Sequence, residues 1–245
     1  MPISPNQGSS AGGTAVVITG TNLANASAVR FGTTPGTITG NTPTSVNVTS
    51  PAGHGAVGVR VTTPGGTSSP LSYFYLEPPT KFSLSPTSGD EAGTNSVTIT
   101  GSNLNGATSV TFGANAGTIT SSNSGSIIVT VPAGTGTVPI TVVTPGGSTN
   151  GLFYEYVAAP TVTDIDPDAG PTAGGTGVTI EGAGFTPASS VTFGGTPASF
   201  VVISDTELSA VTPAGAAGAV DVVVTTAGGS ATLTGGFTYV AGPGV

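Results

Sequence analysis

The stretch GTAVVITG, residues 13–20, decides the fold because the chain repeats it. It returns as GTNSVTITG ending at Gly101 and as GTGVTIEG ending at Gly182, so the spacing is 81 residues both times. The Phe-Gly pair of residues 31–32 and the Pro-Ala-Gly triplet of residues 51–53 return at the same spacing. Such a period is typical of a row of small, similar domains.

Apolar residues recur at every second position inside a copy, as Val16 and Ile18 do, and again Val46 and Val48. This period, with many Val, Thr and Phe residues, is typical of half-buried β-strands. The clusters TTPG and TPGG between these runs are typical of turns, and no segment has a helical period. Six or seven short strands per copy predict an antiparallel β-sandwich. We expect an all-β chain of three domains, over residues 1–76, 77–157 and 158–245.

The linkers at residues 76–79 and 157–160 read LEPP and VAAP. Short, proline-containing linkers restrict the motion of the domains that they join. The three sandwiches are therefore expected to form a semi-rigid rod.

The charge composition narrows the range of partners. The 245 residues include three Lys or Arg, eleven Asp or Glu, one His and no Cys, with a net charge of −8 at pH 7. Nucleic acids and anionic membrane surfaces attract clustered basic residues, so we expect neither as a partner. No apolar run is long enough to span a membrane, and the N-terminal sequence MPISPNQGSS lacks the regions of a signal peptide. No membrane insertion and no cofactor are expected.

Each copy contains the motifs Ile/Leu-x-Pro-x-x-Gly, Gly-Thr-x-Val-x-Ile-x-Gly, Val-x-Phe-Gly, Pro-Ala-Gly and Thr-Pro-Gly-Gly, followed by a closing aromatic pair. In this order they resemble the IPT/TIG family of immunoglobulin-like domains, over essentially the whole chain. The third copy departs at Ala227, where the others have Pro64 and Pro145. The matching residues of the first copy are Ile3, Pro5, Gly8, Gly13, Thr14, Gly20, Leu23, Val29, Phe31, Gly32, Pro51, Gly65 and Tyr75.

The resemblance implies three tandem immunoglobulin-like sandwiches of the E-set type. Relatives of this family occur in plexin-type receptors, Rel-type transcription factors, cyclodextrin-forming glucanotransferases, bacterial surface proteins and phage tail proteins. Since one fold serves many functions, the resemblance implies only an interaction or spacer module.

Asp164, Asp166 and Asp168 are a weak candidate for a calcium site, since carboxylates at alternate positions can converge on Ca²⁺. The EF-hand pattern fails, because glycine comes one place late at Gly170 and Gly175 stands where the bidentate acid belongs. A solvated acidic face is the favoured interpretation, and no metal is expected.

His54, the single histidine, lies in a turn with no acidic residue before Glu77, so an exposed turn residue is favoured over a catalytic base. With no credible acid and base pair in any copy, we expect no enzyme.

The closing aromatic residues allow two interpretations. If Tyr73, Tyr75 and Tyr239 are exposed, they could stack on sugar rings and make the chain a glycan-binding module. Because equivalent aromatic residues close all three copies, packing in the core is favoured.

The two ends of the chain carry complementary parts of one repeat. Met1 aligns with Thr163, so the first copy lacks the start of its first strand, while Pro243-Gly244-Val245 matches Pro160-Thr161-Val162. Residues 1–76 hold two basic residues and no acidic one, and residues 158–245 hold seven acidic residues and no basic one. These features predict head-to-tail assembly through Met1, Pro2 and Ile3 of one copy and Pro243, Gly244 and Val245 of another, unless any window of a repeat array would match in this way.

The combined expectation is a non-enzymatic structural or adhesive protein of a cell surface, an extracellular filament or a virion, such as a phage tail or capsid decoration. Its partners would be proteins, including further copies of itself. The alternative is a carbohydrate- or receptor-binding accessory module of a larger surface protein or enzyme.

Overall fold

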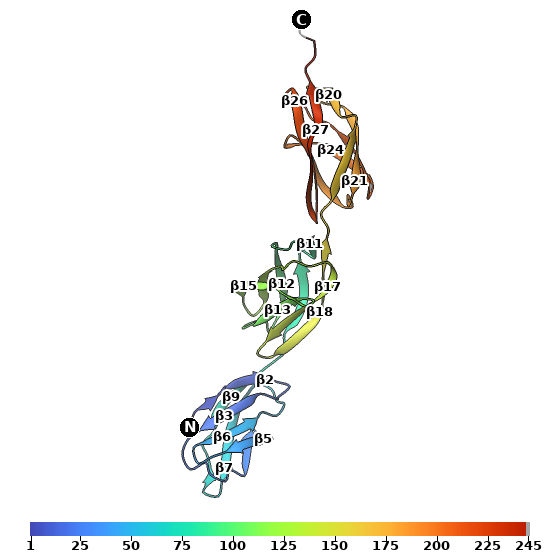
Figure 1. Cartoon of the computed structure of the whole chain (residues 1–245). Helices are drawn as coiled ribbons and strands as arrows, with labels where there is room; N and C mark the ends of the chain where they lie inside the picture. The colour runs from blue at the N-terminus through green and yellow to red at the C-terminus, as the bar shows by residue number, and fades with distance from the viewer. Residues whose placement is uncertain (244–245) are drawn as a thin grey trace. The chain divides into compact units, whose positions relative to one another are not determined.

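The computed structural model describes residues 1–243, and every regular element in that range is a β-strand (Figure 1). No helix that could cross a membrane occurs among these residues. The strands form three consecutive sets, β1 to β9, β10 to β18 and β19 to β27, each of which we call a sandwich. By its internal contacts the chain divides into two compact units, residues 1–85, 96–130 and 139–152, and residues 86–95, 131–138 and 153–245, so the division passes through the second sandwich.

The first sandwich is one folded sheet with the strand order β1-β3-β6-β5-β4-β7-β9-β2, and β8 pairs with β7. Strand β5 belongs to both layers, because its first residues pair with β4 and its later ones with β6. The strands are β1 (Ile3–Ser4), β2 (Gln7–Ser9), β3 (Ala15–Thr19), β4 (Ala28–Phe31), β5 (Thr34–Asn41), β6 (Ser45–Thr49), β7 (Ala56–Thr63), β8 (Gly66–Thr67) and β9 (Leu71–Leu76).

The second sandwich has two sheets, ordered β10-β12-β16-β15 and β11-β18-β17-β13-β14. Its strands are β10 (Thr80–Ser85), β11 (Ser88–Asp90), β12 (Ser96–Ser102), β13 (Ser109–Phe112), β14 (Asn115–Ala116), β15 (Thr118–Ser122), β16 (Ser126–Thr130), β17 (Gly136–Thr144) and β18 (Gly147–Val157).

The third sandwich repeats this order as β19-β21-β25-β24 and β20-β27-β26-β22-β23. Its strands are β19 (Thr161–Asp166), β20 (Ala169–Pro171), β21 (Gly177–Ala183), β22 (Ala188–Phe193), β23 (Thr196–Pro197), β24 (Ser199–Ser204), β25 (Glu207–Val211), β26 (Gly218–Thr226) and β27 (Gly229–Val240).

Each sandwich therefore has nine strand segments, more than the six or seven expected. The first predicted strand of each copy is split into two segments, because the chain crosses from one layer to the other within it. In the first sandwich β1 pairs with β3 antiparallel, whereas β2 pairs with β9 parallel in the other layer. The same split separates β10 from β11 and β19 from β20.

Because side chains alternate between the two faces of a strand, every second side chain points into the core. In β3 Val16 and Ile18 are buried and their neighbours are exposed. In β6 Val46 and Val48 are buried, Asn47 between them is exposed, and the outer neighbours are half-buried. Burying one such side chain stabilises the fold by about 1.5–3 kcal/mol before chain entropy is subtracted. The core of the first sandwich consists of Val16, Ile18, Leu23, Val29, Phe31, Val46, Val48, Val59, Val61, Tyr73 and Tyr75. The core of the third consists of Ile165, Val178, Ile180, Phe185, Val191, Phe193, Leu208, Ala210, Val222, Val224, Phe237 and Tyr239.

Candidate functional site

The Pro-Ala-Gly triplet holds the closing tyrosine of each copy. The Tyr75 hydroxyl donates to the Pro51 carbonyl oxygen at 2.9 Å, and the ring lies so close to Gly53 that a Cβ there would be 2.5 Å from Tyr75 Cε2. Tyr156 and Tyr239 make the same bond to Pro132 and Pro213, at 2.8 and 2.6 Å. Burial raises the pKa of all three tyrosines. Glycine is required at this position because the ring occupies the place of a side chain.

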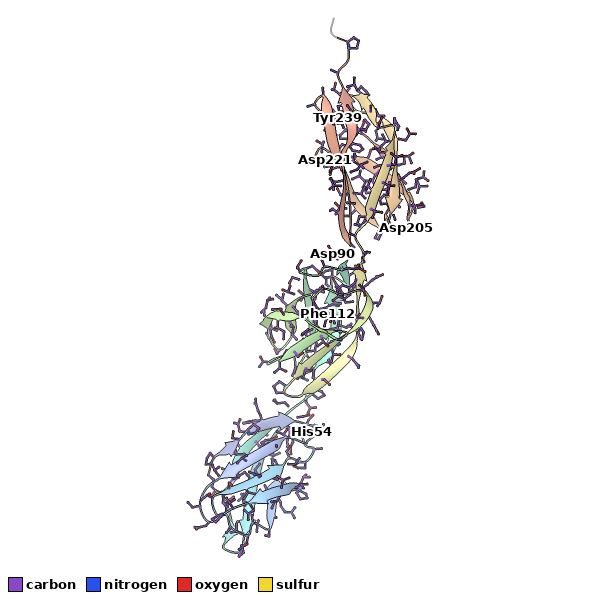
Figure 2. All side chains as sticks on the ribbon, in the orientation of Figure 1. His54, Asp90, Phe112, Asp205, Asp221 and Tyr239 are labelled. Carbon is purple, nitrogen blue, oxygen red and sulfur yellow. The ribbon has the colours of Figure 1, made fainter. Side chains whose placement is uncertain are left out.

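The exposed-aromatic interpretation is therefore wrong for Tyr73, Tyr75 and Tyr239, which are 0%, 6% and 3% exposed. Tyr73 and Tyr75 pack edge to face with their ring centroids 5.2 Å apart, inside the first core. A sugar ring cannot reach them. Tyr239 is labelled within the third sandwich in Figure 2.

The ring two residues before the closing tyrosine differs among the copies. In the second sandwich the Asn95 amide donates to the Tyr154 hydroxyl at 2.9 Å. In the first sandwich the buried Tyr73 hydroxyl has no hydrogen-bond partner within residues 1–243. In the third the residue is Phe237, which has no hydroxyl.

The acidic residues of the third sandwich do not come together. Asp164, Asp166 and Asp168 are all exposed, and the described part of the chain contains no group of three His, Cys, Asp or Glu that could hold a metal ion. Asp205 and Asp221, labelled at different places on this sandwich in Figure 2, bind backbone amides: Asp205 accepts from Gly184 N in the loop after β21, and Asp221 accepts from Gly235 N of β27 at 2.8 Å. Asp164, Asp166 and Asp168 remain a weak calcium candidate, which titration calorimetry would test.

His54 has an acidic partner that the sequence analysis missed. Its Nδ1 lies 2.8 Å from Glu77 Oε1, and the Ser10 hydroxyl donates to Glu77 Oε2 at 3.1 Å. The hydrogen bonds from His54 and then Ser10 lower the pKa of the Glu77 carboxyl. The His54 side chain is 82% exposed, as expected of a turn histidine, and the pair fastens the start of the first linker to the first sandwich.

Lys81 is the one lysine of the chain, and it lies at the start of β10. Its Nζ donates to the Ile140 carbonyl oxygen. Desolvation by burial lowers the pKa of the amine from 10.5 to about 8. In the third sandwich the same register position is taken by Val162, which pairs with Gly182 as Lys81 pairs with Gly101.

Two loops form what we call the end site of each sandwich. One is the Thr-x-Gly-Gly turn, and the other is the loop that follows β3, β12 or β21. In the second sandwich the linker lies on this end site. The Asn103 amide donates to the Pro78 carbonyl oxygen at 3.1 Å. Gly146 is buried, and a Cβ there would lie 2.1 Å from the Glu77 carbonyl oxygen. The linker backbone thus runs directly over the glycine.

The third sandwich repeats this contact with its own linker. A Cβ at Gly228 would lie 2.1 Å from the Ala158 carbonyl oxygen, and one at Gly184 would lie 3.3 Å from Pro160 Cα. Gly228 is buried like Gly146. The two linkers therefore occupy equivalent places.

The end site of the first sandwich is open. Gly65, the equivalent of Gly146, is exposed, and a Cβ there would meet only Thr63 Oγ1, at 3.7 Å, among the described atoms within 4 Å. The turn Thr63–Gly66 and the loop 21–25 line a groove of about 640 Å³, and the buried Leu23 and Val61 also contribute to its lining. This groove is the candidate interaction site that the sequence analysis did not identify.

The N-terminal residues named as assembly candidates lie beside this groove. Met1 contributes to its lining, the Pro2 carbonyl accepts from Thr19 N at 3.1 Å, and Ile3 pairs with Ile18. Strand β1 has two residues, whereas β10 and β19 have six. Of the C-terminal candidates, Pro243 is exposed, while Gly244 and Val245 lie outside the described residues.

Apolar side chains are exposed on the outer face of strands β24 and β25. Val201, Ile203 and Val211 are 62%, 57% and 46% exposed. The second sandwich has Thr120, Ser122 and Thr130 at the equivalent positions. Since β24 is also the edge of its sheet, this surface, which we call the β24 patch, is available for pairing with another chain.

Comparisons with solved structures find distant matches. The plexin A4 extracellular region is 24% identical over 88% of this chain and 21% of that chain, with a TM-score of 0.47. A surface glycan-binding protein, SGBP-B from a xyloglucan utilization locus in Bacteroides uniformis, is 22% identical over 66% of this chain and 49% of that one, with a TM-score of 0.32. The I9–I11 tandem of titin is 10% identical over 96% and 95%, with a TM-score of 0.39.

This chain spans about a fifth to a third of the two plexin structures, 21% and 33%. No curated protein matches it. The family comparison covers nearly the whole chain, since the IPT/TIG domain matches residues 1–75, 79–156 and 160–239. Together with the repeated strand order, this match shows that the chain belongs to the IPT/TIG domain family, as three tandem immunoglobulin-like β-sandwiches.

Proposed function

We propose that this chain is a non-enzymatic structural or adhesive protein that acts outside the cell, on a cell surface, in an extracellular filament or on a virion. The observation that carries the proposal is the use of the repeated motifs in packing. The Pro-Ala-Gly triplet holds the closing tyrosine, and the Thr-x-Gly-Gly turn of the second and third sandwiches holds a linker. The repeated motifs thus serve to pack each domain and to attach it to its linker.

The arrangement of ionisable groups supports the non-enzymatic part of the proposal. General acid–base catalysis needs a pair of groups in a cleft with matched pKa values. Within residues 1–243 the acidic and basic side chains that lie in contact are Glu77 and His54, on an exposed surface. Asp205 and Asp221 accept hydrogen bonds from backbone amides. The chain therefore acts through surfaces, among which the β24 patch suits a protein partner.

Localisation tests this proposal. An antibody raised against the chain is applied to cytosolic, surface and virion fractions of the source organism. We expect the protein in the surface, filament or virion fraction, and an exclusively cytosolic protein would overturn the proposal. The expected rod would be tested separately, by small-angle scattering.

Glycan binding is a second candidate because two aromatic rings are exposed. Phe74 and Phe153 are 44% and 59% exposed, which leaves a ring face open to a sugar. The test is titration calorimetry with soluble polysaccharides, preceded by a glycan array. Phe74→Thr and Phe153→Ser introduce the residues that other copies carry at these positions, Thr238 and Ser72. A saturable signal lost in these variants supports glycan binding, and a blank array excludes it for the glycans on the array.

A further inference from the structure

The sheet β19-β21-β25-β24 of the third sandwich ends in β24, which has a neighbouring strand on one side only within the described chain. Native proteins usually protect such an edge with a charged residue, a proline or a bulge. Residues 199–204 read SFVVIS, so β24 contains no charged residue and no proline. The edge is therefore open to backbone hydrogen bonds with an added strand.

The register of β24 differs from that of β15, the corresponding edge of the second sandwich. In β15 two residues pair with β16 before the register shifts between Ile119 and Ser121. In β24 four consecutive residues, 199–202, pair with β25 before the shift. Because a bulge bends its strand, β24 offers a longer regular run to a partner than β15 does.

The outer face beside this edge is apolar and hollowed. The β24 patch exposes Val201, Ile203 and Val211. A hollow of about 150 Å³ lies between β24 and β25, and Val201 and Val211 contribute to its lining. When a strand adds to a sheet edge, such hollows take alternate side chains of the added strand. An apolar side chain suits this hollow because two valines line it.

A row of three carboxylates crosses the same face of the sheet. Asp164 lies opposite Glu181 in the register, and Glu181 lies opposite Glu207. Each is exposed and follows or precedes a buried core residue in its strand, so all three belong to the outer face. Like charges directly opposite each other repel, and residues 158–245 contain no basic residue that could neutralise them. A basic partner would relieve this repulsion.

The second sandwich has neither feature at the corresponding positions. Ser83, Thr100 and Ser126 take the places of the three carboxylates, and the Ser83 and Thr100 hydroxyls share a hydrogen bond of 2.6 Å. Thr120 takes the place of Val201. The apolar edge and the acidic row thus occur together, on one face of one sandwich, which indicates that they form a single surface.

From the open edge, the apolar hollow and the charges beside them, we propose that β24 binds an extended segment of another protein in which apolar residues alternate with Lys or Arg. The segment adds to the sheet as a fifth strand and places an apolar side chain in the hollow. Ser204, which pairs with Glu207, has a short side chain, so a long basic side chain can reach over it. Its charged end enters a second hollow of about 270 Å³, which Glu181 and Glu207 help to line.

Charge argues against a second copy of this chain as the occupant. Two β24 edges that paired with each other would bring two acidic rows together, and like charges across a contact oppose binding. The basic residues also lie in the wrong places for an added strand. Arg30 and Arg60 lie in β4 and β7, which have neighbouring strands on both sides, and Lys81 donates to the Ile140 carbonyl oxygen. The inference rests on the proposed function and deepens it, because it names the chemistry of the protein partner.

Two peptides of strand length, about seven residues, test the pairing. One alternates lysine with valine and the other alternates glutamate with valine, and both have blocked ends. Each is titrated into the isotope-labelled full chain and followed by NMR. The lysine peptide is expected to shift the amide signals of β24 and β25 saturably, and the glutamate peptide to shift none. Because the interface is small, we expect a dissociation constant on the order of 0.1–1 mM at low salt and weaker binding at high salt.

Two variants separate the edge from the charges. Val201→Lys places a positive charge on the exposed edge and is expected to weaken binding of the lysine peptide on the order of tenfold. Glu207→Ser is expected to weaken it by up to about fivefold, since one exposed ion pair is lost. Thr120→Lys and Glu155→Ser are the matched controls, because they make the same changes in charge on the second sandwich, and we expect them to bind like the wild type. The amide spectrum of each variant shows whether it is folded.

The proposal is overturned if the lysine peptide shifts no signal of β24, if the glutamate peptide binds equally well, or if Val201→Lys binds like the wild type. Self-association of the wild type that Val201→Lys abolishes would instead assign the edge to a second copy. An exclusively cytosolic protein that binds the lysine peptide through β24 would contradict the proposed function but not this docking edge. A surface protein that does not bind it would contradict the docking edge alone.

Discussion

The first and second sandwiches contain the same motifs in the same strand order, yet they differ at two places. At the end site, Gly146 lies under a linker and Gly65 is open. At the inner ring position, the Tyr154 hydroxyl is bonded to Asn95 and the Tyr73 hydroxyl has no partner in the described residues. The comparison shows that a repeated residue does not have a repeated energetic contribution, because its partners lie outside the motif.

The end site gives the largest expected difference between the two. Gly146→Ala would place a methyl group 2.1 Å from the Glu77 carbonyl oxygen, which is backbone and cannot move aside alone. Such overpacking costs about 1–3 kcal/mol. We expect the linker to come off its turn, with faster amide exchange at Leu76, Glu77 and Thr80 and a lower melting temperature for the second sandwich.

Gly65→Ala is the control for this change, because its Cβ is 3.7 Å from the nearest atom. Hydrogen exchange followed by mass spectrometry compares the two variants with the wild type. Equal effects at Gly146 and Gly65 would show that the linker does not rest on the turn.

The inner ring gives the next difference. Tyr154→Phe leaves the half-buried Asn95 amide without its 2.9 Å partner, and losing such a hydrogen bond costs about 1 kcal/mol. Tyr73→Phe removes a hydroxyl that has no hydrogen bond in the described structure, so the first sandwich is expected to gain stability or stay unchanged. Calorimetric unfolding of both variants checks this contrast, and a loss of stability in Tyr73→Phe would show that its hydroxyl is bonded.

Much of the fold could be predicted from the sequence because its signals are local. Alternation at Val16 and Ile18, the glycine and proline turns and the 81-residue spacing are all properties of neighbouring residues, and the sandwiches follow from them. The extra strand segments could not be predicted in this way, since the change of layer between β1 and β2 depends on which strand each one pairs with.

The candidate site was less predictable, because it too depends on which distant residues come together. Asp164 and Tyr73 were candidates because of their chemistry, but in the structure Asp164 is exposed without a cluster and Tyr73 is buried. Glu77 could not be recognised as the partner of His54 because it lies 23 positions away in the chain. The groove beside Gly65 leaves no signal in the sequence, because the exposure of Gly65 and the burial of Gly146 and Gly228 depend on which backbone segment lies over each turn.

A third difference concerns the first strand of the second and third sandwiches, where Lys81 takes the place of Val162. Burial favours the neutral amine, so the folded pKa is about 8 against 10.5 in the unfolded chain. Between these values the unfolded chain binds more protons, and stability rises with pH. Buried tyrosines have raised pKa values, so they oppose this rise above pH 10.0.

We therefore expect the second sandwich to become more stable from pH 8 to pH 10, and Lys81→Val to remove the rise. Denaturant melts of both proteins across this range measure the effect. The third sandwich, with Val162 at the equivalent position, is an internal control that should stay flat. A rise that persists in Lys81→Val would place its origin in another group.

The smallest effect is expected at the start of the linkers, where Glu77 in the first corresponds to Ala158 in the second. Hydrogen bonds from His54 and Ser10 lower the pKa of Glu77 below 4.5. A carboxyl with a lowered folded pKa contributes stability above its unfolded pKa and loses it as the pH falls through the folded value. NMR titration of the Glu77 carboxyl carbon should give a midpoint below 4.5, and His54→Ala should move it back toward 4.5 further than Ser10→Ala does, because the His54 bond is the larger cause. If neither variant moves the midpoint, the His54 contact does not hold the first linker, and the two linkers are attached alike, through their end sites alone.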